Sequence, residues 1–320
     1  MWTICRRFSI FPVTKLLMNA AKMSTSVEIQ LTVPWGHISG KSWGNPAGKH
    51  VLALHGWLDN AGSFDTLIPL LSSDLHVVAI DLPGHGRSSH RPRGSTYNAF
   101  QYVADVQYVI DALKWEKFSL LSHSLGAGVS SWFAASQPNL VERLVLLDGG
   151  GFVHAPVADI PKLMGRALSG LSAGDKMLDN KSFSTWDSVV DKVWEGQRQR
   201  QVGFSREAAG VLAVRGAIQM ESGEYRLTRD LRLKQPSLLR ITEDTNTAFL
   251  AAIQCPVLFI RAEDSYLDLE LFKSSIEAIR KSNLQQLTVA GGHHVHLEHP
   301  ERISGTISDF FQNTSCPGKL

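Results

Sequence analysis

The stretch Ser122-His-Ser-Leu-Gly126 lies directly between a predicted strand and a predicted helix. In such a strand–turn–helix, the sharp turn lifts the central side chain above the edge of a sheet. Small residues two positions away on either side let the strand and the helix approach closely. Gly126 meets that requirement, whereas Ser122 stands where a glycine is typical. Ser124 is therefore the candidate nucleophile, although a serine that only caps a helix would give the same local pattern.

Strand-like and helix-like segments alternate on both sides of this turn, which predicts an α/β fold: a mostly parallel sheet with helices on both faces. The predicted strands cover residues 28–33, 36–43, 51–54, 77–80, 118–122, 141–147, 256–260 and 284–289. The predicted helices cover residues 61–71, 97–113, 125–136 and 267–280, and a last helix begins at residue 300. The first two strands are expected to pair in antiparallel fashion.

The alternation stops in the middle of the chain for about a hundred residues, which is too long for a plain connection in a compact domain. Amphipathic helical patterns at residues 186–201 and 205–220 predict that this region, residues 152–252, is an inserted helical cap. The α/β core is then expected at residues 27–151 and 253–313.

The two ends of the chain differ from its middle. Residues 1–26 carry four basic residues and no acidic residue, with apolar residues between them. We predict a leader there, either a mitochondrial transit peptide, which is basic and poor in acids, or a disordered segment. Residues 314–320 form a predicted tail that ends in Gly318-Lys-Leu320. This ending is one residue away from the peroxisomal address S-K-L, and a chance match is the alternative.

The composition excludes several classes of protein. The 320 residues are 43% hydrophobic and 19% charged, with a net charge of +2. No long basic run lies outside the leader, so we expect no nucleic-acid partner, and there is no run of about 18 apolar residues to predict a membrane span. The three cysteines, Cys5, Cys255 and Cys316, are widely spaced. They indicate a reducing, intracellular setting and neither a disulfide framework nor a zinc site.

A dinucleotide-binding turn is a second interpretation of the same stretch. Gly126-x-Gly128 follows a strand and opens a helix, and Asp148 ends the next strand at a spacing that suits a ribose-binding acid. The third glycine position of that fingerprint holds Ser131, however. At least two strands also precede it, whereas the fingerprint belongs to the first strand–helix unit. We therefore expect no nucleotide cofactor.

His55-Gly56-Trp57 ends the predicted strand at residues 51–54, which is where an oxyanion-hole loop belongs. The backbone N–H groups of Trp57 and Leu125 are expected to converge on a carbonyl oxygen as it becomes an alkoxide. Loss of one such donor typically raises the barrier by about 3 kcal/mol. An ordinary strand-ending turn with a buried aromatic side chain is the alternative.

The candidate general base is His293, which follows Gly292 in the loop after the last predicted strand, where it is free to reach the nucleophile. His294 and His296 in the same loop are expected to be structural and partly buried. A His-rich loop without nearby cysteines or carboxylates is weak evidence for a metal, so no metal site is expected. His123, beside the nucleophile, is expected to point away from it.

The candidate acid is Asp264, which follows the predicted strand at residues 256–260. It lies between Ser124 and His293 in the chain, and Ser, acid, His is the order found with nucleophiles on such turns. Three other carboxylates compete for the role: Glu263, Asp268, and Asp148 at the end of the strand at residues 141–147.

Four motifs, taken in order and with their spacing, resemble the α/β-hydrolase superfamily from residue 27 to about residue 311. They are His55-Gly56, Asp81-x-Pro-Gly-His-Gly-x-Ser88, Ser122-x-Ser124-x-Gly126 and Gly292-His293-x-x-x-x-Glu298-x-Pro300. Within it, the chain is most similar to the serine hydrolase-like proteins of animals. Two stretches carry that similarity: Val33-Pro-Trp-Gly-His-Ile-Ser-Gly-Lys-Ser-Trp43 and Leu54-His-Gly-Trp-Leu-Asp-Asn60. The resemblance implies a serine nucleophile at Ser124, no cofactor, and a cytoplasmic or peroxisomal setting.

A serine at the turn suits acyl transfer to water through an acyl-enzyme, whereas the related epoxide hydrolases and dehalogenases use a carboxylate. We therefore expect a serine hydrolase that acts on a small-molecule carboxylic ester or thioester, with the cap as one wall of its pocket. The alternative is a catalytically weak or inactive scaffold that binds a ligand or partner through the cap. Ser122 and the unsettled acid favour that alternative. Nothing in the sequence indicates the oligomeric state.

Overall fold

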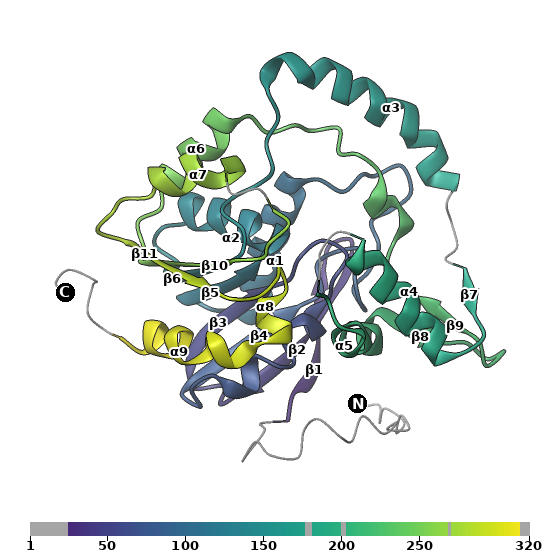
Figure 1. Ribbon diagram of the computed structural model, residues 1–320, viewed down its shortest axis with the longest axis horizontal. Coiled ribbons are helices and arrows are strands. Elements are labelled where there is room, and N and C mark those ends of the chain that lie inside the picture. Colours follow the sequence, from purple (N-terminus) through teal and green to yellow (C-terminus); the bar gives the residue numbers. More distant parts are fainter. Residues whose placement is uncertain (1–24, 177–180, 200–202, 268–269, 314–320) are drawn as a thin grey trace.

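The computed structural model describes residues 25–176, 181–199, 203–267 and 270–313. The predicted tail and all but the last two residues of the predicted leader lie outside them. The centre of the described part is an eight-stranded sheet with helices packed around it (Figure 1). Within these ranges, no helix has both the length and the apolar character that crossing a bilayer requires.

The strands of this sheet that are followed by candidate site residues all end at the same edge of the sheet. In spatial order they are β1 (Val27–Val33), β2 (Gly36–Gly44), β4 (Leu75–Ile80), β3 (Lys49–Leu54), β5 (Phe118–His123), β6 (Val141–Leu147), β10 (Val257–Ala262) and β11 (Leu284–Val289). β1 pairs with β2, and β2 with β4, in antiparallel fashion, and every further pair is parallel. Because parallel strands end at the same edge, the loops after β3, β5, β6, β10 and β11 meet there.

Apolar side chains of the strands point alternately to the two faces of the sheet, and helices pack against the apolar side chains on each face. In β3, Leu52 and Leu54 belong to one buried cluster, and Val51 and Ala53 to another. The first cluster includes residues of α1 (Ala99–Leu113), α2 (Leu125–Ser136), α6 (Glu243–Ala251) and α7 (Glu270–Ala278). The second includes residues of α9 (Ser304–Gln312). The predicted fold class, a mostly parallel sheet covered on both faces, is confirmed.

Some predicted helices differ from the observed ones. The segment predicted as one helix at residues 61–71 forms two 3-10 helices, Ala61–Phe64 and Ile68–Leu70. Pro69 contributes to this, because it has no backbone N–H to continue a helical ladder. The last predicted helix begins with a 3-10 turn at Pro300–Arg302 and continues as α9. A short helix, α8 (Val295–Glu298), precedes it and was not predicted.

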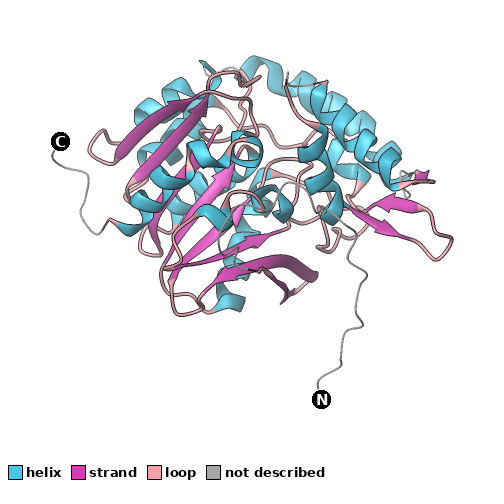
Figure 2. Ribbon diagram, turned by 60° about the horizontal axis from the view of Figure 1, so that its bottom comes forward, coloured by secondary structure: helices cyan, strands magenta, loops and turns pink. Residues whose placement is uncertain are grey.

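The region predicted as a cap contains strands as well as helices. Its helices are α3 (Ile160–Lys176), α4 (Trp186–Arg198), α5 (Arg206–Gly216) and α6. Of these, α6 packs on the large sheet, so the predicted bounds of 152–252 include a helix of the core layer. A separate antiparallel sheet joins β7 (Ser182–Phe183), β9 (Tyr225–Leu227) and β8 (Ala217–Gln219). The helix predicted at residues 205–220 therefore ends at residue 216, and a strand follows. Figure 2 shows this small sheet at the side of the molecule, away from the large one.

A buried arginine attaches α5 to the core. Arg215 Nε donates to both carboxylate oxygens of Asp81, at 2.9 and 2.8 Å, and Arg215 Nη1 donates to both oxygens of Glu28, at 2.6 and 2.7 Å. Asp81 also accepts from the backbone N–H groups of Ala61 and Arg87. Its side chain is 0% exposed and that of Arg215 is 3% exposed. The ion pair thus joins residues 152–252, which we call the inserted region, to the loop after β4.

Arg215→Met should lower the free energy of unfolding by about 3–5 kcal/mol, because Asp81 would remain buried without its cation. Urea denaturation of the purified protein measures this change. The matched control is Arg206→Met, which removes exposed ion pairs to Asp187 and Asp191 and should have little effect. Equal unfolding midpoints for the two variants would contradict the anchoring role of Arg215.

Candidate active site

Ser124 occupies a strained turn at the junction of β5 and α2. Its backbone angles are φ 52° and ψ −114°, a region that L-amino acids rarely adopt. The backbone N–H of Ser124 donates to the carbonyl of Leu147 in the neighbouring strand β6, at 3.1 Å. The side chain of Ser124 is half-buried at the start of α2. This is the geometry that a nucleophile on such a turn requires.

The residues around Ser124 explain how the turn is packed. A Cβ atom at Gly126 would lie 2.2 Å from the carbonyl oxygen of Leu54, so only glycine fits this approach of α2 to β3. Ser122 is fully buried, and its hydroxyl donates to the carbonyl of Val145 at 3.1 Å and lies 2.5 Å from the Ser130 hydroxyl. The departure from glycine at residue 122 is therefore accommodated by hydrogen bonds.

His293 and Asp148 form a buried pair beside this turn. His293 Nδ1 donates to Asp148 Oδ2 at 2.6 Å, and the two side chains are 2% and 1% exposed. Asp148 also accepts from the backbone N–H of Ala262, at 2.9 Å, and from the hydroxyl of Ser265, at 2.5 Å. Burial raises the pKa of Asp148, but the donors His293 and Ser265 outweigh it and hold that pKa below its usual value. Burial lowers the pKa of His293, and Asp148 opposes this shift.

The carboxylate that contacts His293 is therefore Asp148, and the prediction of Asp264 for that position is corrected. Asp264 is exposed in the turn after β10, where its backbone N–H donates to the carbonyl of Gly291. Glu263 is exposed in the same turn, and Asp268 lies outside the described residues. The reason lies in the sheet order, because β6 is the direct neighbour of β5 and ends beside Ser124.

Ser124, Asp148 and His293 thus follow β5, β6 and β11 at one edge of the sheet. His123, which precedes Ser124, is fully buried, and its Nε2 donates to the carbonyl of His293 at 3.0 Å. Within the described residues, no hydrogen bond joins the Ser124 hydroxyl to the His293 ring. Such bonds are often long in unliganded enzymes and tighten when the substrate binds.

Two buried histidines of the sequence motifs, His55 and His85, fix the candidate oxyanion loop, a role that the sequence analysis did not assign to them. His55 Nε2 accepts from the backbone N–H of Leu82 at 2.9 Å, and His85 Nε2 accepts from that of Leu58 at 3.1 Å. Burial lowers the pKa of His55 to about 4 and that of His85 to about 3, so both rings are neutral and can accept. The sequence could have indicated this role, because both histidines lie in glycine-containing turns that follow buried strands.

Trp57, one of the two expected oxyanion residues, lies in this loop. Its side chain is 38% exposed, and its indole Nε1 donates to the carbonyl of Leu233 in the inserted region, at 3.0 Å. Leu125, the other, is the first residue of α2, where backbone N–H groups have no acceptor within the helix. The expectation that these two N–H groups face a developing oxyanion stays a prediction.

A cavity of about 710 Å³ opens next to the loops after β10 and β11, and Ser124, Asp148 and His293 are not among its lining residues. Its lining includes Phe204, Ser265, Tyr266, Gly292 and His294, and the Tyr266 ring lies 4.7 Å from the His293 ring, centroid to centroid. Phe204 belongs to the inserted region, which therefore forms one wall. This volume is in the range of small-molecule sites.

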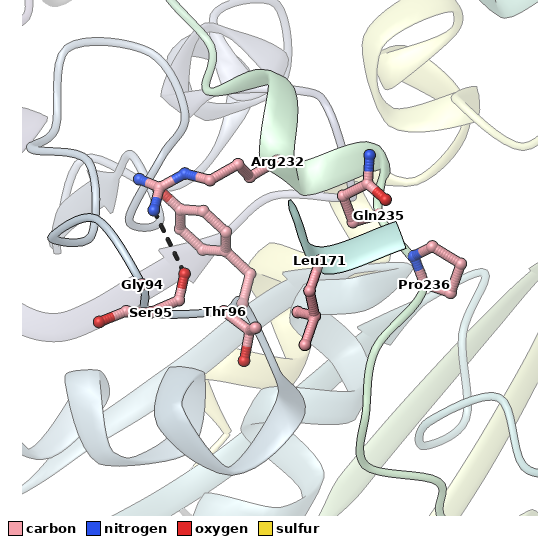
Figure 3. A pocket seen from close by; sticks show the side chains of 8 residues that line it. Gly94, Ser95, Thr96, Leu171, Arg232, Gln235 and Pro236 are labelled. Carbon is pink, nitrogen blue, oxygen red and sulfur yellow. Dashed lines mark hydrogen bonds between the residues drawn. The ribbon is translucent and has the colours of Figure 1, made fainter. Parts of the chain in front are cut away.

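A second cavity lies where α3 and the segment after β9 meet the loop before α1 (Figure 3). It measures only about 30 Å³, which is room for about one water molecule. In Figure 3, Arg232 closes it through a hydrogen bond to the carbonyl of Ser95, at 3.2 Å. This cavity is too small for an organic substrate.

Nothing supports the dinucleotide interpretation. A Cβ atom at Gly128 would lie 2.7 Å from the Phe152 ring, so this glycine packs against a side chain and leaves no space for a phosphate. Asp148, the expected ribose-binding acid, is buried and accepts from His293. The glycines of this turn therefore serve helix packing.

A further set of buried polar side chains lies behind His293. Asp59 Oδ2 is 3.0 Å from His294 Nε2 and 3.6 Å from His123 Nδ1, and Asp59 Oδ1 accepts from Gln197 of α4 at 3.1 Å. Burial raises the pKa of Asp59, but the His294 ring beside its carboxylate outweighs burial and holds that pKa well below its usual range. Burial lowers the pKa of His123 and, further still, that of His296. One ligand atom each from Asp59, His123 and His294 lies within 4.8 Å of the others, although no metal site was expected.

Comparisons with known proteins agree with this architecture. A family model described as "alpha/beta hydrolase fold" matches residues 49–300. A serine hydrolase-like protein of Danio rerio is 37% identical over 293 residues, which cover 90% of this chain and 89% of the relative. Serine hydrolase-like protein 2 of Homo sapiens is 33% identical over 301 residues, which cover 90% of this chain and 94% of the relative.

Solved structures show the same fold. A hypothetical protein of Pseudomonas aeruginosa PAO1 matches with a TM-score of 0.80 and 34% identity, over 89% of this chain and 99% of that one. A thioesterase domain from the curacin biosynthetic pathway matches with a TM-score of 0.73 and 24% identity, over 88% and 99%. The sheet order, the turn at Ser124 and these matches agree, and the chain belongs to the α/β-hydrolase family as a relative of the animal serine hydrolase-like proteins.

Proposed function

We propose that this protein is a serine hydrolase that cleaves a carboxylic ester or thioester through an acyl-enzyme. The observation that carries the proposal is the 2.6 Å hydrogen bond between His293 Nδ1 and Asp148 Oδ2, at the edge of the sheet where Ser124 occupies its strained turn. A nucleophile, a base and a buried acid that orients the base are the three parts of such a site.

Each residue has a defined task in this reaction. With Nδ1 bonded to Asp148, the neutral His293 ring has its lone pair on Nε2, which accepts the proton of Ser124 as the hydroxyl attacks the acyl carbon. Asp148 holds the ring in this tautomer and stabilises the imidazolium that forms. The backbone N–H groups of Leu125 and Trp57 donate to the oxyanion. His293 then returns the proton to the leaving group and activates the water that cleaves the acyl-enzyme.

The size of the cavity favours a small-molecule acyl substrate. It lies against Tyr266, which contacts His293, and Phe204 brings the inserted region to its rim. The bond from the Trp57 indole to Leu233 also connects the candidate oxyanion loop to that region. The inserted region is thus placed to select the acyl group.

A non-catalytic scaffold is the second candidate. The observation in its favour is that no hydrogen bond joins Ser124 to His293 in the part of the chain that the structure describes. In that case the cavity would bind a ligand that is not turned over. Labelling of Ser124 distinguishes the two candidates.

A fluorophosphonate probe should label the wild-type protein, and Ser124→Ala should remove the label, because the probe reacts with an activated serine. His293→Ala should also abolish labelling, since the base is lost. Ser122→Ala is the matched control: it removes a hydroxyl two residues away that bonds only to Ser130 and Val145, and its labelling should persist. Absence of labelling in folded wild-type protein would favour the scaffold.

Asp148→Asn should slow labelling by three to four orders of magnitude, because an amide at this position favours the wrong tautomer of the base; loss of the orienting carboxylate typically costs roughly 10⁴-fold. Asp264→Asn is the comparison variant: its carboxylate is exposed in its turn and lines the cavity without contacting His293, so it should change the rate far less than Asp148→Asn. The rates are compared by in-gel fluorescence against time. A large loss in Asp264→Asn with none in Asp148→Asn would reverse the assignment of the acid.

The labelling rate should fall at acidic pH with a midpoint below about 6.5, the ordinary pKa of histidine. Burial lowers the pKa of His293, so the ring stays neutral and able to accept a proton to a lower pH than a free histidine. Second-order labelling rates between pH 4 and pH 8 give this midpoint. A midpoint above 6.5 would show that Asp148 outweighs burial, contrary to this expectation.

A further inference from the structure

Three buried side chains that the proposed reaction does not use converge behind the catalytic loops. Asp59 follows the candidate oxyanion loop, His123 immediately precedes Ser124, and His294 immediately follows His293. Asp59 and His294 are 3% exposed, and His123 is 0% exposed. Their ligand atoms, one from each residue, lie within 4.8 Å of one another. Polar groups buried to this degree need partners.

One of these atoms has no partner. The carbonyl oxygen of His293 can only accept, so His123 Nε2, 3.0 Å away, carries the ring proton. The neutral ring, which burial favours, then has a lone pair at Nδ1. Nδ1 has no hydrogen-bond partner among the described residues, and it faces the carboxylate atom Asp59 Oδ2 at 3.6 Å. Two electron-pair donors thus point at one position in a dry interior, where a cation would be stabilised by both.

The backbone at Gly56 packs directly against these two atoms. A Cβ atom at Gly56 would lie 2.8 Å from His123 Nδ1 and 3.0 Å from Asp59 Oδ2, which is closer than a side chain can pack. Any other residue at 56 would therefore displace the imidazole nitrogen or the carboxylate oxygen. Glycine at this position keeps the two atoms where they are.

We propose that Asp59, His123 and His294 bind a divalent transition-metal ion of the Zn²⁺ class. Two imidazoles and one carboxylate suit such an ion, whereas Mg²⁺ and Ca²⁺ prefer oxygen ligands. Bond lengths of about 2.0–2.2 Å place tetrahedral ligand atoms about 3.3 Å apart. The observed separations of 3.0 and 3.6 Å from Asp59 Oδ2 bracket that value. His294 Nε2 releases its proton when the ion binds.

The surroundings provide an outer shell and a route to the site. His123 Nε2 donates to the carbonyl of His293, and Gln197 Nε2 donates to Asp59 Oδ1 at 3.1 Å. Such bonds orient metal ligands and fix the histidine tautomer. His294 lines the 710 Å³ cavity, so the site is one side chain away from solvent. A bound ion would cross-link the loops that carry Ser124, His293 and the candidate oxyanion donors.

The experiment uses untagged, chelator-treated full-length protein titrated with CoCl₂ and, separately, with ZnCl₂. We expect one equivalent of Co²⁺ to give the visible absorption bands of a low-coordinate cobalt site, Zn²⁺ to displace them, and Zn²⁺ to raise the melting temperature. Asp59→Asn and His294→Gln should each lose the bands and the temperature shift. His299→Gln is the matched control, because His299 lies at the other end of α8 from His294 with an exposed side chain, and it should keep both.

Absence of cobalt bands in the wild type, or bands that survive both ligand variants, would overturn the proposal. If the ligand variants do not fold, zinc-edge anomalous diffraction from wild-type crystals decides: a peak between the three side chains supports the site, and its absence refutes it. These readouts do not require Ser124 to react, so failure of the proposed hydrolase function and failure of the metal site are separate outcomes.

Discussion

The positive φ of Ser124 is the constraint on which the rest of the site depends. An L-residue adopts this conformation only when its surroundings enforce it, and here both sides of the turn are fixed. Strand β5 is buried between β3 and β6, and α2 is pressed so closely to β3 that residue 126 must be glycine. Hydrogen bonds from Ser122 to Val145 and from Ser124 to Leu147 tie the turn to β6. The core therefore stabilises a local strain that exposes one hydroxyl at the sheet edge.

Burial shifts the pKa values of Asp148 and His293 in opposite directions: it raises that of the carboxyl group and lowers that of the imidazole. A dry environment favours the neutral form of both a carboxyl group and an imidazole. Asp148 stays ionised because it accepts from a ring nitrogen, a hydroxyl and a backbone N–H at once. His293 stays neutral because one carboxylate does not offset the loss of water around its ring. The same burial therefore leaves a charged acceptor beside a neutral imidazole, the combination that the proposed acyl transfer uses.

Local patterns in the sequence are sufficient to predict most of the sheet and the strained turn that carries Ser124. Strand β6 is predictable because its apolar run is continuous, and Ser124 because the turn chemistry of residues 122–126 is local. The choice between Asp264 and Asp148 is not local, because it depends on which strands are neighbours in space. The 3-10 turns at residues 61–70 and the strand at residues 217–219 escape prediction because tertiary contacts override helical periodicity there. Asp59, His123 and His294 come together only because the loop after β3, the end of β5 and the loop after β11 converge in the fold, and no spacing along the chain predicts that.

The inserted region is attached unevenly to the core of the molecule. On one side, α5 is held by the buried Arg215–Asp81 pair and α4 by the bond from Gln197 to Asp59. On the other side, Ala167 alone is buried among the described side chains of α3, residues 160–171, while Met164 and Leu168 are exposed. Moving α4 or α5 would leave buried charges or polar groups unpaired, which is costly. Moving α3 gives up little buried apolar area, so α3 is the helix of the inserted region whose displacement requires the least free energy.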